Sequence, residues 1–161
     1  RFWFLENLAR MPYFAYISCL HFYETIGVWR IDDNLREVHY KEEANESNHL
    51  IIMESLGGNK YWIDRFIARH LSLMYYTVLV ILYFATPSVA YKASELLERH
   101  AVDTYETFKI KNKRRLKQMP PSSFAKRYYK SKCKNLYDVF SLICLDEYEH
   151  ANEMQYLNID I

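Results

Sequence analysis

A Glu-x-x-His pair occurs twice in this chain, and the repeat constrains the fold more than any other feature. Glu46 is followed by His49, and about a hundred residues later Glu147 is followed by His150. Residues three apart lie on one face of an α-helix, so each pair can point one carboxylate and one imidazole at the same place. Four-helix proteins with a di-metal carboxylate centre carry such a pair on each of two helices and a single Glu on each of the other two.

Single glutamates in the right order complete this pattern. Glu6 precedes the first pair and Glu98 lies between the two pairs, while Glu24 competes with Glu6 on the same segment. Mixed carboxylate and imidazole ligands suit iron or manganese, and open coordination positions suit iron that reacts with dioxygen. The sequence therefore predicts a centre of two iron ions whose ligands are Glu6 or Glu24 together with Glu46, His49, Glu98, Glu147 and His150.

The residues that flank the two pairs argue against a chance pattern. A single Glu-x-x-His is a weak motif, because a glutamate-rich helix produces this spacing by chance on a solvated face. Here one apolar run, 50–53, follows the first pair, and another, 139–145, precedes the second. Buried Glu and His side chains cost free energy unless they are paired or bound to metal, so these flanks favour metal ligands.

Four stretches resemble the motifs of the alternative oxidase family. They are RFWFLENLARMP at 1–12, NESNH at 45–49, LERHAVDTY at 97–105 and DEYEH at 146–150. Three further stretches resemble the plastid terminal oxidase (plastoquinol oxidase) branch: YETIGVWR at 23–30, HLIIMESLGG at 49–58 and LYDVF at 136–140. Members of that branch usually carry a longer segment before LYDVF, which is where this chain departs from them.

The resemblance implies a membrane-bound quinol:oxygen oxidoreductase that oxidises plastoquinol or ubiquinol and reduces dioxygen to water without pumping protons. It favours Glu6 over Glu24 as an iron ligand, because the family's first ligand stands in a Leu-Glu-x-x-Ala-x-x-Pro context. It also implies quinol contacts at Arg1 and Thr104. Tyr105 matches a tyrosine beside the irons, and we expect this phenol to supply an electron and a proton.

Residues next to the ligands are expected to orient them. Asn45 and Asp146 each stand immediately before a ligand Glu, and one helical step from a ligand often still faces the core. Histidines that bind metal usually donate their other ring N–H to a carboxylate or carbonyl, so we expect Asn45 and Asp146 to serve them. Tyr105 follows Glu98 by two helical turns on the same face, which would bring its hydroxyl within reach of a group beside the ligands, such as Asp146.

The chain is expected to form an all-α fold, a ferritin-like four-helix bundle around a di-iron centre, with an interfacial membrane helix packed at one end. Only three Gly and four Pro occur among 161 residues, which favours long helices. The expected helices cover 2–26 with a kink at Pro12, 32–57, 64–85, the stretch from Pro87 past Tyr105, and 136–156. We expect one domain, 1–161, as a fragment that lacks its N-terminus, with reduced cysteines.

The segment 64–85 is the most apolar part of the chain. Its uncharged run from Leu71 to Thr86 has 16 residues, fewer than the roughly twenty that a membrane-spanning helix needs. We therefore expect this helix to lie in one leaflet of a membrane, with a buried core helix as the alternative. The expected location is the thylakoid membrane of a plastid, or else the mitochondrial inner membrane, and a homodimer is left open.

The segment 109–134 carries eleven Lys or Arg and no acid, which leaves net −10 on the rest of the chain. With Pro120 and Pro121 in it, this segment is expected to be a basic loop. Contact with anionic lipid and a simple solvated linker are both open interpretations. Nucleic acid is not an expected partner, because the acidic remainder would repel phosphate.

Three other functions fit parts of the pattern. A di-iron quinone-ring monooxygenase would use the same ligands, and a hydroxylated product would distinguish it from an oxidase. A non-enzymatic ferritin-like iron-binding bundle would need a hydrophilic exterior, against which the apolar stretch 71–85 argues. A metal-free interaction bundle would contain no iron after purification.

Overall fold

The computed structural model describes residues 1–28, 30 and 32–159 of the chain. Within that part every regular element is helical, so the predicted all-α class is confirmed there. The elements, in order, are α1 (Phe2–Ala9), α2 (Met11–Thr25), α3 (Asp33–Ser55), α4 (Trp62–Ala85), α5 (Pro87–Lys111), α6 (Lys113–Gln118), α7 (Ser123–Tyr128), the short 3₁₀ helix η1 (Lys130–Lys132) and α8 (Leu136–Ile159).

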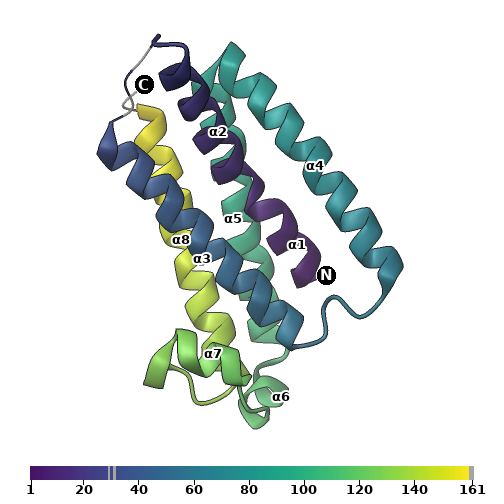
Figure 1. The fold of residues 1–161 in the computed structure, drawn as a ribbon. Helices are drawn as coiled ribbons and strands as arrows, with labels where there is room; N and C mark the ends of the chain where they lie inside the picture. Colours follow the sequence, from purple (N-terminus) through teal and green to yellow (C-terminus); the bar gives the residue numbers. More distant parts are fainter. Residues whose placement is uncertain (29, 31, 160–161) are drawn as a thin grey trace.

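Four rods of helix form the bundle that carries the ligands (Figure 1). Helices α1 and α2 run end to end as one rod, and α3, α5 and α8 are the other three. The largest contact in the bundle is between α5 and α8, while α1 and α2 pack on α3. This arrangement places one predicted ligand segment on each rod.

The ends of α3 are determined by local chemistry. At its start, Oδ1 of Asp32 accepts a hydrogen bond of 2.7 Å from the backbone N–H of Asn34, as expected for an N-cap. Beyond its end, Gly57 has a φ of +85°, a conformation that favours glycine. A Cβ on Gly58 would lie 2.5 Å from Cβ of Trp3, so glycine there lets the turn pack closely on α1.

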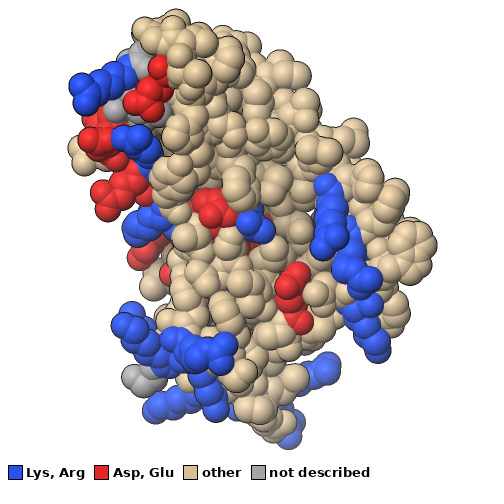
Figure 2. All heavy atoms as spheres, in the orientation of Figure 1, with Lys and Arg blue, Asp and Glu red and all other residues tan. Residues whose placement is uncertain are grey.

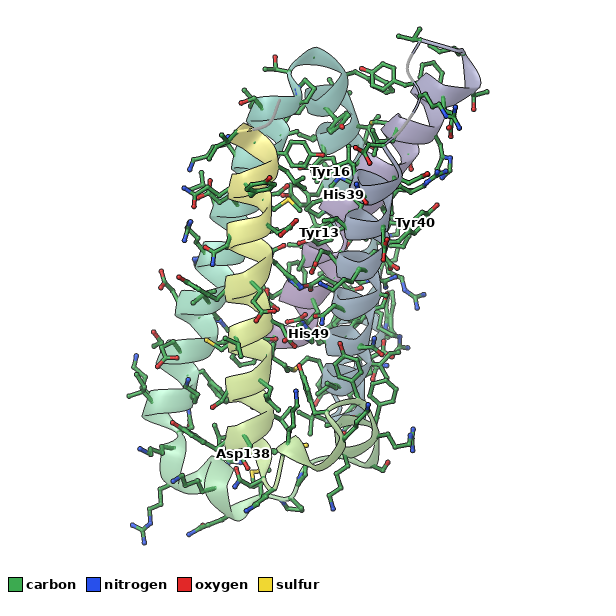
Figure 3. The ribbon with its side chains drawn as sticks, turned by 90° about the vertical axis from the view of Figure 1, so that its left-hand side faces the viewer. Tyr13, Tyr16, His39, Tyr40, His49 and Asp138 are labelled. Atoms are coloured by element: carbon green, nitrogen blue, oxygen red, sulfur yellow. The ribbon has the colours of Figure 1, made fainter. Side chains whose placement is uncertain are left out.

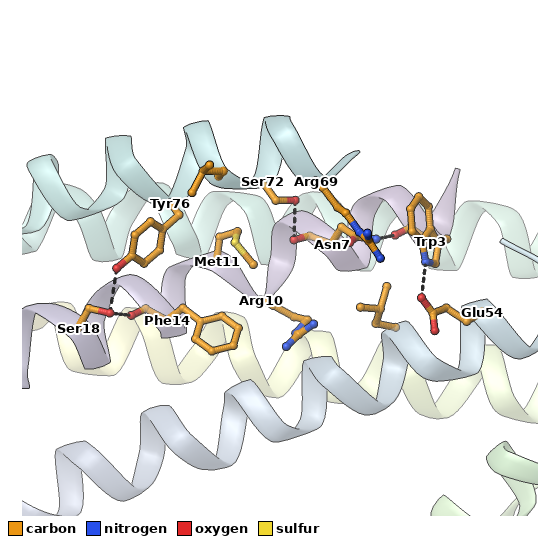
Figure 4. A pocket seen from close by; sticks show the side chains of 12 residues that line it. Trp3, Asn7, Arg10, Met11, Phe14, Ser18, Glu54, Arg69, Ser72 and Tyr76 are labelled. Atoms are coloured by element: carbon orange, nitrogen blue, oxygen red, sulfur yellow. Dashed lines mark hydrogen bonds between the residues drawn. The ribbon is translucent and has the colours of Figure 1, made fainter. Parts of the chain in front are cut away.

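Helix α4 lies along the flank of the bundle beside α1 and α2 (Figure 1), so its predicted position at one end is wrong. The reason is that its buried residues form a stripe along the whole helix: Ala68, Ser72, Leu79 and Tyr83. Two hydrogen bonds join α4 to α1 and α2. Ser72 Oγ donates to the backbone oxygen of Asn7 at 3.0 Å, and the hydroxyl of Tyr76 donates to Ser18 Oγ at 3.0 Å (Figure 4). A cavity of about 630 Å³ lies between α4, α1–α2 and α3.

The outer face of α4 is apolar. Its large apolar residues with 40% exposure or more are Trp62, Ile63, Phe66, Ile67, Leu71, Leu73, Met74, Val78, Ile81 and Phe84, while Asp64, Arg69 and His70 are exposed near its start. The helix is long and apolar enough to cross a membrane. Only 22% of its most apolar stretch of 18 residues is buried against the rest of the protein. Figure 2 shows this uncharged surface over the upper part of α4, while Lys and Arg gather at the end formed by α6 and α7.

The basic segment 109–134 is not the predicted loop. Helix α5 continues to Lys111, and α6, α7 and η1 follow. Apolar side chains within the segment explain this, because Leu116, Ala125 and Cys133 are buried in the core at this end of the bundle. Helix α6 packs on α8, and α7 packs on α3.

Candidate di-metal centre

All six predicted ligands point into the middle of the bundle. Glu6 comes from α1, Glu98 from α5, and α3 and α8 each contribute one Glu-x-x-His pair. Each of the six side chains belongs to a residue with at most 2% exposure. By contrast, Glu24 lies at the surface of α2 and faces Arg36 at 3.9 Å, so it is not part of this cluster.

The ligand atoms form two groups, and the two groups share two carboxylates. One group contains Glu6 and His49, the other contains Glu98 and His150, and both contain Glu46 and Glu147. Within each group, one atom from every residue lies within 4.8 Å of the others. Each group therefore offers one His, one Glu of its own and two shared Glu, which is the ligand set of two neighbouring metal ions bridged by carboxylates.

Buried oxygens without partners show that the residues fit such ions. Oε2 of Glu6, Glu98 and Glu147 is buried and has no hydrogen bond. Nδ1 of His150 lies 2.7 Å from Oε1 of Glu46, yet neither atom has a hydrogen-bond partner. Unsatisfied buried polar atoms are costly, and carboxylate and imidazole ligands suit iron or manganese, so bound cations would remove this cost.

The pKa shifts of the ligand carboxyl groups also favour bound cations. Burial raises the pKa of Glu6 and Glu147 well above the usual value, and the nearby carboxylate of Glu46 raises both further. The same two causes raise the pKa of Glu98 to about 7. Burial acts in this direction on Glu46 too, but the imidazole of His150 outweighs it and lowers that pKa. Positive charge at the centre would let all four carboxyl groups ionise.

Each histidine has a carboxylate on its outer nitrogen. Nδ1 of His49 lies 3.1 Å from Glu147 Oε1 inside the cluster, whereas its Nε2 lies 3.0 Å from Asp146 Oδ2. Nε2 of His150 lies 2.6 Å from Glu42 Oε2. Such outer carboxylates hold the imidazole ring in place and increase its basicity as a ligand.

The structure therefore places Asp146 as predicted but not Asn45. Asn45 donates to the hydroxyl of Tyr128 at 2.8 Å, and its Oδ1 is buried without a hydrogen bond, so neither atom bonds a ligand histidine. One residue is about 100° around a helix, so Asn45 and Asp146 both lie beside the ligand face, and the side of α3 that carries Asn45 is the one on which α7 packs. The sequence analysis missed Glu42. This residue lies four positions before Glu46 and therefore on the ligand face of the helix, and that spacing could have identified it.

Two tyrosines donate hydrogen bonds to Glu6 and Glu98, the two ligand carboxylates that the groups do not share. Tyr105 donates to Oε1 of Glu6 across the bundle, so its predicted contact with Asp146 is wrong. The hydroxyl that binds Asp146 belongs to Tyr129, at 2.7 Å. Tyr13, also missed from the sequence, donates to Oε1 of Glu98 at 3.0 Å. Burial, followed by the charge of Glu6, raises the pKa of Tyr105 well above the usual value, so it stays protonated.

The two residues expected to contact quinol line one cavity. This cavity has a volume of about 280 Å³. Arg1 and Thr104 both line it, together with His100, Asp103, Thr107, Phe108, Lys111 and Asn112. Thr104 is next to Tyr105 in the chain, so the cavity wall and the hydrogen bond to Glu6 are adjacent.

A four-helix bundle with these ligands on its four rods defines the class of di-metal carboxylate proteins. Residues 1–158 match the model of a family described as "Alternative oxidase". The chain is also 43% identical over 175 aligned residues to "Ubiquinol oxidase 4, chloroplastic/chromoplastic" of Arabidopsis thaliana, an alignment that covers 96% of this chain and 50% of the relative. The chain belongs to the alternative oxidase family, and the resemblance seen in its motifs is confirmed.

The relative differs from this chain in extent. The chain spans about half the length of the curated relative that it matches. The 175 aligned positions exceed the 161 residues of the chain, so the relative has residues within the aligned region that this chain lacks.

Proposed function

We propose that this protein is a quinol oxidase that transfers electrons from quinol to dioxygen at two iron ions and forms water. The observation that carries the proposal is the pair of overlapping ligand groups that share Glu46 and Glu147, in a chain of the alternative oxidase family. Two iron ions bound there would supply two electrons to dioxygen together. The overall reaction needs four electrons, which two quinols supply, and no proton-pumping channel is part of the proposal.

The protein's own residues hold and insulate the centre. Asp146 and Glu42 orient His49 and His150 through their outer nitrogens. The closely packed side chains Ile52 and Ile143, both with 0% exposure, belong to the surrounding helices and help to exclude bulk water. A dry site strengthens the attraction between carboxylates and metal ions and limits side reactions.

Quinol is proposed to bind in the cavity lined by Arg1 and Thr104, whose donors suit the quinol oxygens. Tyr105 connects this place with the centre, because it follows Thr104 and donates to Glu6. We propose that its phenol passes an electron and a proton together, which avoids leaving charge in a dry site.

Contact with a membrane follows from the substrate and from α4. A lipid-soluble quinol must enter from a membrane, and the apolar residues exposed on α4 after Arg69 form the surface that suits one leaflet. The relative is named as chloroplastic, which supports a plastid membrane for this protein, with the mitochondrial inner membrane as the alternative.

Metal analysis combined with quinol-dependent oxygen uptake in liposomes tests the proposal. The expected result is two iron ions per chain, oxygen uptake that requires quinol, and quinone as the only product derived from quinol. Uptake with a hydroxylated quinone would instead indicate a monooxygenase. Iron binding without uptake would indicate an iron-binding bundle.

A further inference from the structure

A second cluster of buried polar aromatic residues lies between the metal centre and the end of the bundle where α5 begins. Its members, all with at most 2% exposure, are Tyr13, Tyr16, His39, Tyr83 and Tyr91. In Figure 3 the labelled side chains of Tyr13, Tyr16 and His39 lie between the helices, above His49. None of the five belongs to the ligand groups, and phenylalanine would fill the same space without a buried hydroxyl.

The rings of this cluster form a continuous path from the metal centre. Tyr13 donates to Glu98, and its ring centroid lies 6.4 Å from that of His39. Tyr16 lies 5.4 Å from His39 and 4.7 Å from Tyr91. Because electron transfer falls off steeply with distance, rings in such close contact conduct an electron far better than a gap of the same total length.

Tyr91 and His39 form a hydrogen-bonded pair at the end of this path. The hydroxyl of Tyr91 lies 2.8 Å from Nε2 of His39, and the two rings stack with an interplanar angle of 14°. Nδ1 of His39 is buried and has no partner. Burial lowers the pKa of His39 to about 4, so the ring is neutral at physiological pH and can accept a proton at Nε2.

We propose that Tyr91 and His39 are a redox-active pair that supplies one electron to the metal centre when dioxygen reacts there and quinol is scarce. The inference rests on the proposed oxidase function, because dioxygen is the oxidant. The role proposed for Tyr91 differs from that of Tyr105, because the hydroxyl of Tyr105 donates to the ligand Glu6. Tyr91 has an acceptor of its own, outside the ligand set.

The step balances in electrons and protons. The phenol of Tyr91 loses one electron, which passes along the rings of His39 and Tyr13 to the centre, where dioxygen is reduced. The O–H bond of Tyr91 breaks, and the proton moves along the hydrogen bond to Nε2 of His39. A neutral phenoxyl radical and an imidazolium result. The next quinol returns the electron, and the proton goes back to the phenol.

Rapid freezing and electron paramagnetic resonance test the pair in the iron-loaded protein in liposomes. The reduced protein is mixed with dioxygen without quinol, and a second sample of the oxidised protein receives hydrogen peroxide. We expect a tyrosyl radical that persists in Tyr105→Phe and is lost in Tyr91→Phe. His39→Phe should remove the hydrogen bond and change the spectrum. Tyr76→Phe, on α4 and outside the path, is the matched control and should leave the radical unchanged.

A measurement on Tyr105→Phe alone covers the case in which Tyr91→Phe does not fold. In heavy water, its radical should show coupling to an exchangeable deuteron at the phenoxyl oxygen, as the bond to His39 requires. A radical that survives Tyr91→Phe, or the absence of any radical with both oxidants, would overturn the proposal. If peroxide produces the Tyr91 radical but quinol-dependent oxygen uptake is absent, the pair stands and the oxidase function fails.

Discussion

Asp146 Oδ2 lies 3.0 Å from Nε2 of His49 and accepts a second hydrogen bond, of 2.7 Å, from the hydroxyl of Tyr129. The carboxylate thus joins a ligand histidine of α3 to the polypeptide that follows α7. Burial acts to raise the pKa of Asp146, but His49 outweighs burial and lowers it, so the group is ionised where it contacts the ring.

Replacing Asp146 by Ala should weaken iron binding by about 10–100-fold, the usual effect of removing a carboxylate that orients a metal-bound histidine. Competition with a chelator measures the affinity. Glu149→Ala, an exposed residue of the same helix, is the control and should bind iron like the wild type. Equal affinities in the two variants would show that Asp146 does not hold His49 for metal binding.

Glu42 should matter to His150 in the same way. Glu42→Ala removes the carboxylate 2.6 Å from Nε2 of His150, so we expect a loss of iron affinity on the order of 10-fold or more. Its neighbour Glu43 faces Arg10 at 2.9 Å instead, which makes Glu43→Ala a matched control. The account of His150 fails if Glu43→Ala releases iron as readily as Glu42→Ala.

Tyr105→Phe should keep both the iron and the fold, because the change removes only a hydroxyl. Turnover should fall while KM for quinol changes little, since the phenol acts after quinol has bound. Steady-state oxygen uptake at several quinol concentrations measures both quantities. Turnover close to wild type in a fully iron-loaded variant would reduce Tyr105 to a packing residue.

Two charges on the outer face of α4 should release the protein from membranes. Met74 and Ile81 are 64% and 62% exposed, so Met74→Glu with Ile81→Glu leaves the core intact. Leu79 is fully buried, and a charge there would test folding instead. Flotation with liposomes measures binding, and Leu145→Glu, at 52% exposure on α8, is the control. Unchanged flotation of the double variant would exclude this surface.

The metal-free protein should lose stability as pH rises. Glu98 has a pKa raised from 4.5 to about 7, so the folded state binds more protons between these values, and stability falls across that window. His150 acts in the same direction, because its raised pKa stabilises the fold until pH rises through that value. Thermal unfolding should therefore occur at a lower temperature at about pH 7 than at about pH 5, and bound iron should reduce this difference.

The sequence could place the two Glu-x-x-His pairs toward the middle of the bundle, because a helix converts sequence spacing directly into a shared face. Both pairs depend only on that local geometry. Contacts between helices were less predictable. Tyr105 lies on the ligand face as expected, but which carboxylate it meets depends on how α5 is rotated against α1.

Two other features depended on tertiary packing. The four-residue spacing to Glu46 puts Glu42 on the ligand face, but its contact with His150 depends on how α3 packs against α8. Likewise, the charge of the segment 109–134 indicated a loop, but its few apolar residues, such as Leu116, pack on the bundle and order α6 and α7. Composition averaged over such a segment hides the residues that determine its structure.

Diffraction at the iron absorption edge from crystals of the iron-loaded protein tests the central claim most directly. The account predicts two anomalous peaks about 3.5–4 Å apart, as in other two-metal sites, with Glu46 and Glu147 between them and one histidine on each. A single peak, or iron bound away from these carboxylates, would contradict it.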